Sequence, residues 1–392
     1  MPHISSEVEK LVPNLIELRR DFHRHPELGF QEERSARVVA ERLKLLGYTV
    51  RTGVGKTGVV GFLKGGKPGK TVLLRADIDA LPIHEEATVA WKSETPGRMH
   101  ACGHDANTAI GLTAAEILAK ELPALSGNVL FIFQPAEEIL SGAAAMLRDG
   151  ALEGVTVDAA FAVHMQNEMP AGTVGLRSGP LMTSADRLDL SVVGKGGHGA
   201  FPHLASDPIM AAAQIITAVQ TLVSRETPPL QMSVLSITTL KAGTAFNIIP
   251  DAVEMSGTFR CYDTDLRETL MGSLRRVAES VAAALKCKAE VRNEWLTPAV
   301  VNDPTLTRIV QELATEILGE KQVVEMQPLT GSDDIAYFWQ KIPGCYAFVG
   351  SAKTDGSPVA QHHNAKFDID ESVMATGVDL LVRAAQRVLE SR

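Results

Sequence analysis

The chain has 392 residues, of which 45% are hydrophobic and 22% charged, and a formal net charge of −9 at pH 7. This length exceeds the usual size of one hydrophobic core, so we expect two domains. The negative charge argues against a nucleic-acid partner, because phosphate binding needs clustered Lys and Arg.

The N-terminal sequence MPHISSEVEK lacks the cationic and apolar regions of a signal peptide. No stretch reaches the roughly 18 apolar residues that a membrane helix needs. The four cysteines are scattered along the chain, which does not resemble a disulfide framework. These features predict a cytoplasmic enzyme with no membrane partner.

The first part of the chain predicts helices that alternate with buried strands. ERSARVVAERLKLLGY (33–48) has apolar residues at helical spacing and reaches Gly47, a usual helix stop. A helix is also expected at 107–122. Apolar runs include TVLLRAD, NVLFIFQ and AAFAVHM, at 71–77, 128–134 and 159–165. Uninterrupted apolar strands between helices indicate a mostly parallel sheet that is buried on both faces.

Polar residues follow the ends of these runs. Asp77, Glu137, Glu138 and His164 each fall just past the end of an apolar run. Ligands of such sheets bind beyond the carboxyl ends of the strands. We therefore expect these side chains to form one site.

A different pattern begins near residue 184. In RLDLSVVG, alternation places Leu188, Leu190 and Val192 on one face of a half-exposed strand. The predicted order is strand, helix, strand, strand, helix and strand, at 187–194, 207–223, 232–240, 252–262, 266–285 and 289–295. This β-α-β-β-α-β order is typical of ferredoxin-like domains.

The chain then returns to the first pattern, with an apolar run at 345–350 and a helix at 371–389. The predicted fold class is therefore α/β, with a mostly parallel-sheet catalytic domain in two segments, 1–183 and 297–392. A ferredoxin-like α+β domain, 184–296, is inserted between them as a lid or dimerisation domain.

Two glycine-rich motifs do not predict nucleotide binding. GVGKTG (53–58) has Val50 where a phosphate-binding loop needs a Gly. GKGGHG (194–199) matches a dinucleotide motif, but Pro202 and Pro208 intervene before the next helix, and no acidic residue follows at about 20 positions.

MHACGHDANTA (99–109) has the ingredients of a metal site. Cys102 and His104 lie on a loop before a helix, whose N-terminus favours a thiolate, and the two ligand types suit zinc or a similar metal. The alternative is a buried Cys beside a capping Asp105. The further donors at Glu137–Glu138, His164 and QHHNAKFD (361–368) favour the metal site.

The Glu137–Glu138 pair points to catalysis. Two carboxylates at the end of a buried strand repel each other unless cations or protons intervene. A metal ligand beside a general base would resolve that repulsion. The alternative is that PAEE starts a helix, where the dipole favours Glu.

Several motifs, in order and nearly end to end, resemble the bimetallic amidohydrolases. That family includes hippurate hydrolase, bacterial N-acyl-amino-acid aminoacylases, auxin-conjugate hydrolases and an archaeal carboxypeptidase. The motifs are LRRDFHRHPELGFQE, LLRADIDALPI, MHACGHD, FQPAEE, GKGGHGAFPH, GTAFNIIPD, GTFR and HHNAKFD.

The resemblance implies a site with two divalent ions. Zinc or manganese is expected first, with cobalt or nickel as alternatives. The implied ligands are Cys102, His104, Glu138, His164 and His363. His363 matches the family ligand because it directly precedes Asn364, although His362 is the alternative within the doublet. Asp77 would hold a ligand in place.

The chain also departs from relatives near this site. In the wider superfamily a metal-binding His occupies the place of Arg75, so the Cys102 cluster is expected to replace that ligand. Asn107 stands where family members commonly have a second His after CGHD. We expect Asn107 to change hydrogen bonds near the ligands. HMQNEMP (164–170) is a candidate to shape the acyl pocket.

The implied reaction is hydrolysis of the amide bond in small N-acyl-amino acids. Metal ions lower the pKa of a water toward about 7 and polarise the carbonyl. Glu137 would take the proton and return it to the departing amine. His198 would stabilise the oxyanion, delivered by a partner subunit or a closing lid, so a homodimer through the inserted domain is expected. Without that analogy, His198 reads as an exposed turn residue.

Asn247 and Arg260 are candidates to bind the substrate carboxylate. Alternation in VEMSGTFRCY places Arg260 on a polar strand face, which also fits a surface Arg. Two other functions stay open: a metallocarboxypeptidase or dipeptidase, and an inert metal-binding protein.

Overall fold

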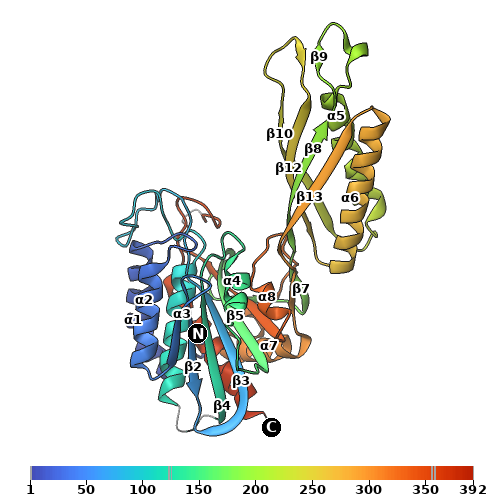
Figure 1. Cartoon of the computed structure of the whole chain (residues 1–392). Coiled ribbons are helices and arrows are strands. Elements are labelled where there is room, and N and C mark those ends of the chain that lie inside the picture. Colours follow the sequence, from blue (N-terminus) through green and yellow to red (C-terminus); the bar gives the residue numbers. More distant parts are fainter. Residues whose placement is uncertain (1, 122–123, 125, 355, 357–358, 392) are drawn as a thin grey trace. The chain divides into compact units, whose positions relative to one another are not determined.

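The computed structural model describes residues 2–121, 124, 126–354, 356 and 359–391 (Figure 1). Residue contacts divide the chain into two compact units. Unit 1 comprises Met1–Leu181, Val301–Pro328 and Asp333–Arg392, and unit 2 comprises Met182–Val300 and Leu329–Ser332. The main part of unit 2 begins and ends within a few residues of the predicted inserted domain 184–296, whereas Leu329–Ser332 lies inside the predicted second catalytic segment.

Unit 1 is built on an eight-stranded sheet with the order β1-β2-β4-β3-β5-β16-β6-β15. Its strands are β1 Thr49–Val54, β2 Gly58–Lys64, β3 Lys67–Asp77, β4 Ser126–Gln134, β5 Ala159–Pro170, β6 Val174–Leu176, β15 Val323–Glu325 and β16 Gly344–Ala352. The four central strands, β4, β3, β5 and β16, pair in parallel. The predicted α/β class with a mostly parallel sheet is confirmed.

Helices cover this sheet. They are α1 Ser6–Arg24, α2 Glu33–Leu45, α3 His104–Lys120, α4 Gly142–Arg148, α7 Pro304–Leu318, α8 Ala336–Trp339 and α9 Met374–Glu390. Nearly all of α3 is buried, because it packs against α1, α9 and the sheet. It begins before the predicted residue 107, and residue 122, at the predicted end, lies outside the described residues. This burial fixes the start of α3 firmly against the strand ends.

One strand is longer than its apolar run. β5 continues to Pro170, so His164 lies inside the strand, where it pairs with Phe348 of β16. The expectation that His164 follows a strand end was wrong. The neighbouring β3 pairs with β5 only as far as Arg75 and Ala162, so the extra length of β5 is held by β16 instead. His164 still lies level with Asp77, since Arg75 pairs with Ala162.

Unit 2 has the predicted β-α-β-β-α-β order. Its sheet runs β10-β12-β8-β13, with β8 Ala185–Val193, β10 Ser233–Ala242, β12 Ala252–Cys261 and β13 Lys288–Thr297. The helices α5 Pro208–Thr221 and α6 Thr264–Ala284 pack on one face of this sheet (Figure 1). Leu188, Leu190 and Val192 are buried beneath them, as their alternation predicted.

Short elements complete the chain. β9 Gly197–His198 pairs with β11 Ile248–Ile249, while β7 Gly179–Met182 and β14 Val300–Asn302 straddle the unit boundaries. Among the described residues, no helix is both long enough and apolar enough to cross a membrane.

Candidate metal centre

The strand ends of unit 1 gather metal-ligating side chains. Asp77 ends β3, His164 lies level with it on β5, and the Glu137–Glu138 pair follows β4. Cys102 and His104 stand at the start of α3. The pair is a turn before α4, which begins only at Gly142, so PAEE does not start a helix.

Among the residues that the structure describes, four groups of three side chains have ligand atoms within 4.8 Å of one another. They are Cys102–His104–His164, Cys102–Glu138–His363, His104–Glu137–Glu138 and Glu137–Asp333–Asp334. We call the residues of the first three groups the metal-ligand cluster. The structure thus brings together all five side chains predicted as ligands, and the predicted base Glu137 beside them.

Two polar atoms of this cluster are in positions where a bound cation would serve as their partner. Among the described residues, His104 Nε2 and Glu138 Oε1 are buried without a hydrogen-bond partner. They lie 3.9 Å apart. Buried polar atoms without a partner are rare in folded proteins. A thiol, imidazoles and carboxylates around such atoms fit a divalent metal ion.

The backbone orients both cluster imidazoles. His104 Nδ1 lies 3.0 Å from the Asp79 carbonyl oxygen, and His164 Nδ1 lies 2.7 Å from the Met165 carbonyl oxygen. Each carbonyl accepts the Nδ1 proton. The Nε2 lone pair of each ring therefore remains available to a metal ion.

Burial favours the protonated forms of the acidic side chains in this cluster. Burial, with Asp333 and Glu138 nearby, raises the pKa of Glu137 well above its ordinary value. Burial also raises the pKa of Glu138 to about 7. The pKa of the Cys102 thiol is raised by burial and by Glu138, so burial outweighs the helix N-terminus that we expected to favour a thiolate. Bound cations would reverse all three shifts.

Asp77 is held from two sides. Its Oδ2 accepts a hydrogen bond from Arg75 Nη1 at 2.5 Å, and its Oδ1 accepts one from Asn107 Nδ2 at 2.8 Å. Burial would raise the pKa of Asp77, but His104 and Arg75 outweigh it and keep the pKa below its usual range. Asn107 also accepts the Met165 N–H at 3.3 Å. It thus ties Asp77 to β5.

Arg75 also binds residues that sequence reasoning missed. Its Nη2 donates to Asp333 Oδ1 at 3.0 Å, and its Nε donates to Gln134 Oε1 at 2.9 Å. The Tyr346 hydroxyl donates to Asp333 Oδ2 at 2.8 Å. The acidic doublet in GSDD (331–334) was the sequence signal for this second carboxylate pair.

α1 fixes the loop that carries Cys102 and His104. Arg19 Nε donates to Asp105 Oδ2 at 2.7 Å, and His23 Nδ1 lies 2.7 Å from the same oxygen. All three side chains are fully buried. Asp105 therefore pairs with α1, which explains why LRRDFHRH accompanies MHACGHD.

The His362–His363 doublet divides into two roles. His363 Nε2 lies 3.3 Å from Glu138 Oε2, within the cluster. His362 Nδ1 lies 3.4 Å from Cys102 Sγ, while its Nε2 accepts the Asn167 N–H at 3.2 Å. Because Nε2 accepts, the proton of a neutral ring is on Nδ1, directed at the sulfur. This geometry favours His363 as ligand.

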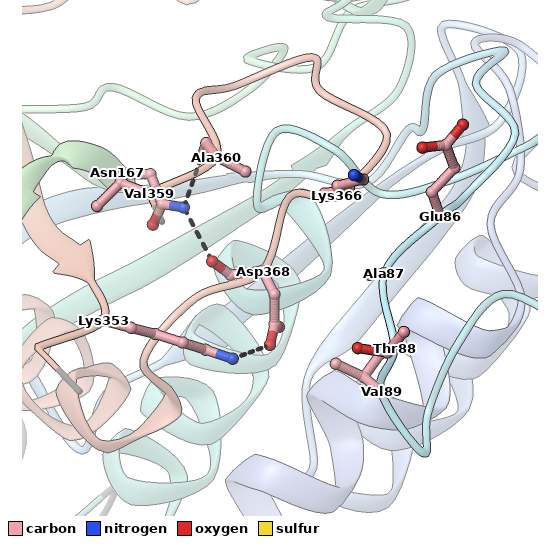
Figure 2. A pocket seen from close by; sticks show the side chains of 10 residues that line it. All are labelled: Glu86, Ala87, Thr88, Val89, Asn167, Lys353, Val359, Ala360, Lys366 and Asp368. Carbon is pink, nitrogen blue, oxygen red and sulfur yellow. Dashed lines mark hydrogen bonds and ion pairs between the residues drawn. The ribbon is translucent and has the colours of Figure 1, made fainter. Parts of the chain in front are cut away.

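Asn167 also lines a pocket of about 430 Å³ (Figure 2). It is lined by Glu86, Ala87, Thr88, Val89, Asn167, Lys353, Val359, Ala360, Lys366 and Asp368. Lys353 Nζ pairs with Asp368 Oδ2 at 2.5 Å, and Asn167 Nδ2 donates to the carbonyl oxygens of Ala360 and Asp368. The HMQNEMP segment thus contributes one wall of a pocket, and His362 links that wall to Cys102.

The other predicted site residues belong to unit 2. His198 and Asn247 lie together on the β9–β11 pair, where the Gly199 N–H donates to the Asn247 carbonyl oxygen at 2.8 Å. Both residues are exposed. Arg260 lies on β12, where its Nη1 donates to Ser332 Oγ at 2.7 Å, and partial burial lowers its pKa.

Comparison with known proteins finds a matching family profile and similar sequences. The profile described as "Peptidase family M20/M25/M40" matches residues 73–387. "Thermostable carboxypeptidase 2" of Saccharolobus solfataricus is 40% identical over 95% of both chains. "N-acetylcysteine deacetylase" of Bacillus subtilis is 39% identical over 96% of this chain and 97% of the relative.

A solved structure resembles the whole chain. The Bacillus subtilis YXEP protein, titled "a Dinuclear Metal Binding Peptidase from M20 Family", superposes with a TM-score of 0.86 at 37% identity. The match covers 98% of this chain and 99% of that one.

Proposed function

We infer that this chain, which belongs to peptidase family M20/M25/M40, is a metal-dependent hydrolase of the amide bond in N-acyl-amino acids. The products are a carboxylate and a free amino acid. The observation that carries this conclusion is a set of three overlapping groups built from a thiol, imidazoles and the Glu137–Glu138 pair, in each of which the ligand atoms lie within 4.8 Å of one another. A relative named for deacetylation of N-acetylcysteine, matched over nearly its whole length, supports it.

The cluster residues Cys102, His104, Glu138, His164 and His363 would hold two divalent ions. Cys102, His104 and Glu138 each belong to two of the three-residue groups, so each would be available to either ion. Zinc or manganese is proposed first, with cobalt or nickel as alternatives. Asp77 is proposed to hold the ligands in place, because Asn107 ties it to β5, which carries His164, and its Oδ2 lies 3.8 Å from His104 Nε2.

Glu137 is proposed as the general base. Its Oε2 lies 3.8 Å from His104 Nε2, beside the proposed ligands. Divalent ions bound there would supply Lewis acidity toward the scissile carbonyl and would lower the pKa of a water. Glu137 would accept a proton from the attacking water and deliver it to the departing amine nitrogen. Its burial keeps bulk water away from this transfer.

Unit 2 is proposed to complete the site. His198 would stabilise the oxyanion, and Asn247 and Arg260 would bind the free carboxylate of the substrate. The exposed position of His198 on the β9–β11 pair suits delivery by a moving lid or a second subunit. We therefore also propose a homodimer formed through this unit. Cytoplasmic location stays a prediction.

The second candidate function is that of a metallocarboxypeptidase, and the relative named "Thermostable carboxypeptidase 2", at 40% identity, favours it. A peptide's C-terminal residue is itself an N-acylated amino acid, so one site can accept both substrates. The kcat/KM values for N-acetyl-amino acids and for dipeptides with the same C-terminal residue would rank the two functions.

The direct test is metal removal. The purified chain is expected to contain about two divalent ions and to lose amide hydrolysis on dialysis against a chelator, because its buried carboxylates need cations. Added zinc, manganese, cobalt or nickel should restore activity. Metal analysis and a panel of N-acyl-amino acids provide the measurement. Full turnover in a metal-free sample would contradict the function.

The doublet gives a second prediction. His363→Ala is expected to weaken metal binding by about 10–100-fold or more, since even residues that merely support ligands have effects of that size. His362→Gln should keep both ions, because His362 contacts Cys102 through an N–H donor. Titration of each apoprotein with metal measures both. The reverse order would make His362 the ligand.

A further inference from the structure

The segment that carries the Glu137–Glu138 pair has an unusual backbone. Ala136 has φ +53°, in the left-handed region that residues with a Cβ rarely adopt. The chain then turns back on itself, because the N–H groups of Ser141 and Gly142 both lie 3.2 Å from the Ala136 carbonyl oxygen. Ala136 directly precedes Glu137, so its conformation sets the direction in which the pair leaves β4. Another part of the fold must hold it.

Glu32 makes that contact. Its Oε1 accepts the Ala136 N–H at 2.8 Å, and its Oε2 accepts the Thr57 hydroxyl at 2.5 Å. Glu32 lies at the start of α2, and its side chain is fully buried. Burying a carboxylate is costly unless its oxygens accept hydrogen bonds. Both Glu32 oxygens accept one, so the carboxylate is matched to these two donors.

The motif GVGKTG (53–58) has its place in the same contact. It forms the turn between β1 and β2, and Thr57 belongs to it. A Cβ at Gly58 would lie 2.9 Å from Pro135 Cδ, so only glycine lets this turn approach the segment. GVGKTG, which does not match a phosphate-binding loop, therefore packs beside Pro135, two residues before Glu137.

Two other buried carboxylates hold the same segment. Asp79 Oδ2 accepts the Glu138 N–H at 3.0 Å, and Asp334 Oδ2 accepts the Ala143 N–H at 2.8 Å. Asp79 also lies beside His104, and Asp334 is linked through Gln134 to Arg75. Glu32 is bonded to neither a proposed ligand nor Arg75. It is therefore the carboxylate whose effect on the segment can be tested separately.

We propose that Glu32 is a positioning residue that directs Glu137 toward the proposed metal ligands by holding Ala136 in its left-handed conformation. The inference rests on the proposed role of Glu137 as general base. Displacement of a reacting group by about 1 Å can lower a rate by about 100-fold. Loss of Glu32 should thus impair the proton transfer while the ligands remain.

The test compares Glu32→Ala, Ala136→Gly and the double variant. Glu32→Ala is expected to lower kcat by about 100-fold, with KM changed by less than about threefold and metal content unchanged. Glycine adopts positive φ without a steric penalty. The double variant should therefore recover kcat by about fivefold or more over Glu32→Ala. Hydrogen exchange at the Ala136 amide should be faster in Glu32→Ala, with or without metal.

Two further variants sharpen the result. Glu32→Gln keeps an acceptor for the Ala136 N–H and should retain kcat within about threefold. Glu27→Ala is the matched control, because Glu27 accepts the N–H groups of Arg34 and Ser35 in α2 and no hydrogen bond from residues 135–142. It should reduce stability and leave kcat nearly unchanged. If Glu32→Ala does not fold, Thr57→Val removes the other donor to Glu32 and serves in its place.

The inference is overturned if Glu32→Ala keeps kcat within about threefold of the wild type. It is also overturned if the double variant has no higher kcat than Glu32→Ala, or if Glu32→Gln loses as much kcat as Glu32→Ala. A wild-type chain without amide hydrolysis would instead remove the proposed function. Amide exchange at Ala136 would still report whether Glu32 holds the segment, so the two failures are distinguishable.

Discussion

Glu137→Ala is expected to lower kcat by about 10²–10⁴-fold, the usual contribution of a general base. The chain should keep about two metal ions, because the proposed ligands at Cys102, His104, Glu138, His164 and His363 are untouched. Metal binding should therefore be no weaker than in the wild type.

The measurement is kcat and KM on the best N-acyl-amino acid, with metal content of the same sample. Glu137→Gln keeps the size of the side chain and should show the same loss. Glu316→Ala is a control, since Glu316 is an exposed partner of Arg387. Unchanged turnover would remove Glu137 from its role. Loss of metal with turnover would make Glu137 a ligand, as the His104–Glu137–Glu138 group would permit.

Cys102→Ala has the second large expected effect. The sulfur is common to the Cys102–His104–His164 and Cys102–Glu138–His363 groups, so its loss would remove a donor from both groups. We expect metal affinity to fall by more than about 100-fold, because residues that only support ligands already account for about 10–100-fold. Amide hydrolysis should fall with metal occupancy and recover in part at high metal concentration.

Metal titration of the apoprotein, followed by the activity at each metal concentration, measures this effect. Cys287→Ala is the matched control, because Cys287 is a buried thiol of unit 2 whose sulfur contacts only the Leu285 carbonyl oxygen among its described hydrogen-bond partners. Two ions bound to Cys102→Ala with wild-type affinity would show that the thiol is not a ligand. The proposed set would then need revision around His104 and Glu138.

Much of the fold was predictable because its signals are local. Apolar runs such as TVLLRAD must be buried on both faces, which selects a parallel sheet covered by helices. Alternation in RLDLSVVG likewise selects a half-exposed strand, and the order of elements then gives the ferredoxin-like unit. The length of β5 was not predictable, because its polar end is stabilised by pairing with β16, far away in the sequence.

The metal-ligand cluster was likewise only partly predictable from the sequence. The residue types Cys102, His104, Glu137 and Glu138 indicated metal chemistry, because few other arrangements tolerate thiol, imidazole and paired carboxylates together. The sequence left His362 and His363 undecided. Only the fold places the Asn167 N–H on one ring and Glu138 beside the other, and thereby gives the two neighbours different tasks.

The sequence by itself determined the class of chemistry and the two kinds of sheet, since both depend on residue type and spacing along the chain. Tertiary structure decided which side chains hold the site residues in place. Arg19 and His23 bind Asp105, Arg75 binds Asp77 and Asp333, and Glu32 accepts the Ala136 N–H. These contacts join segments distant in sequence, so no local pattern encodes them. Each depends on burial, where a charged or polar group needs a partner that only the completed fold supplies.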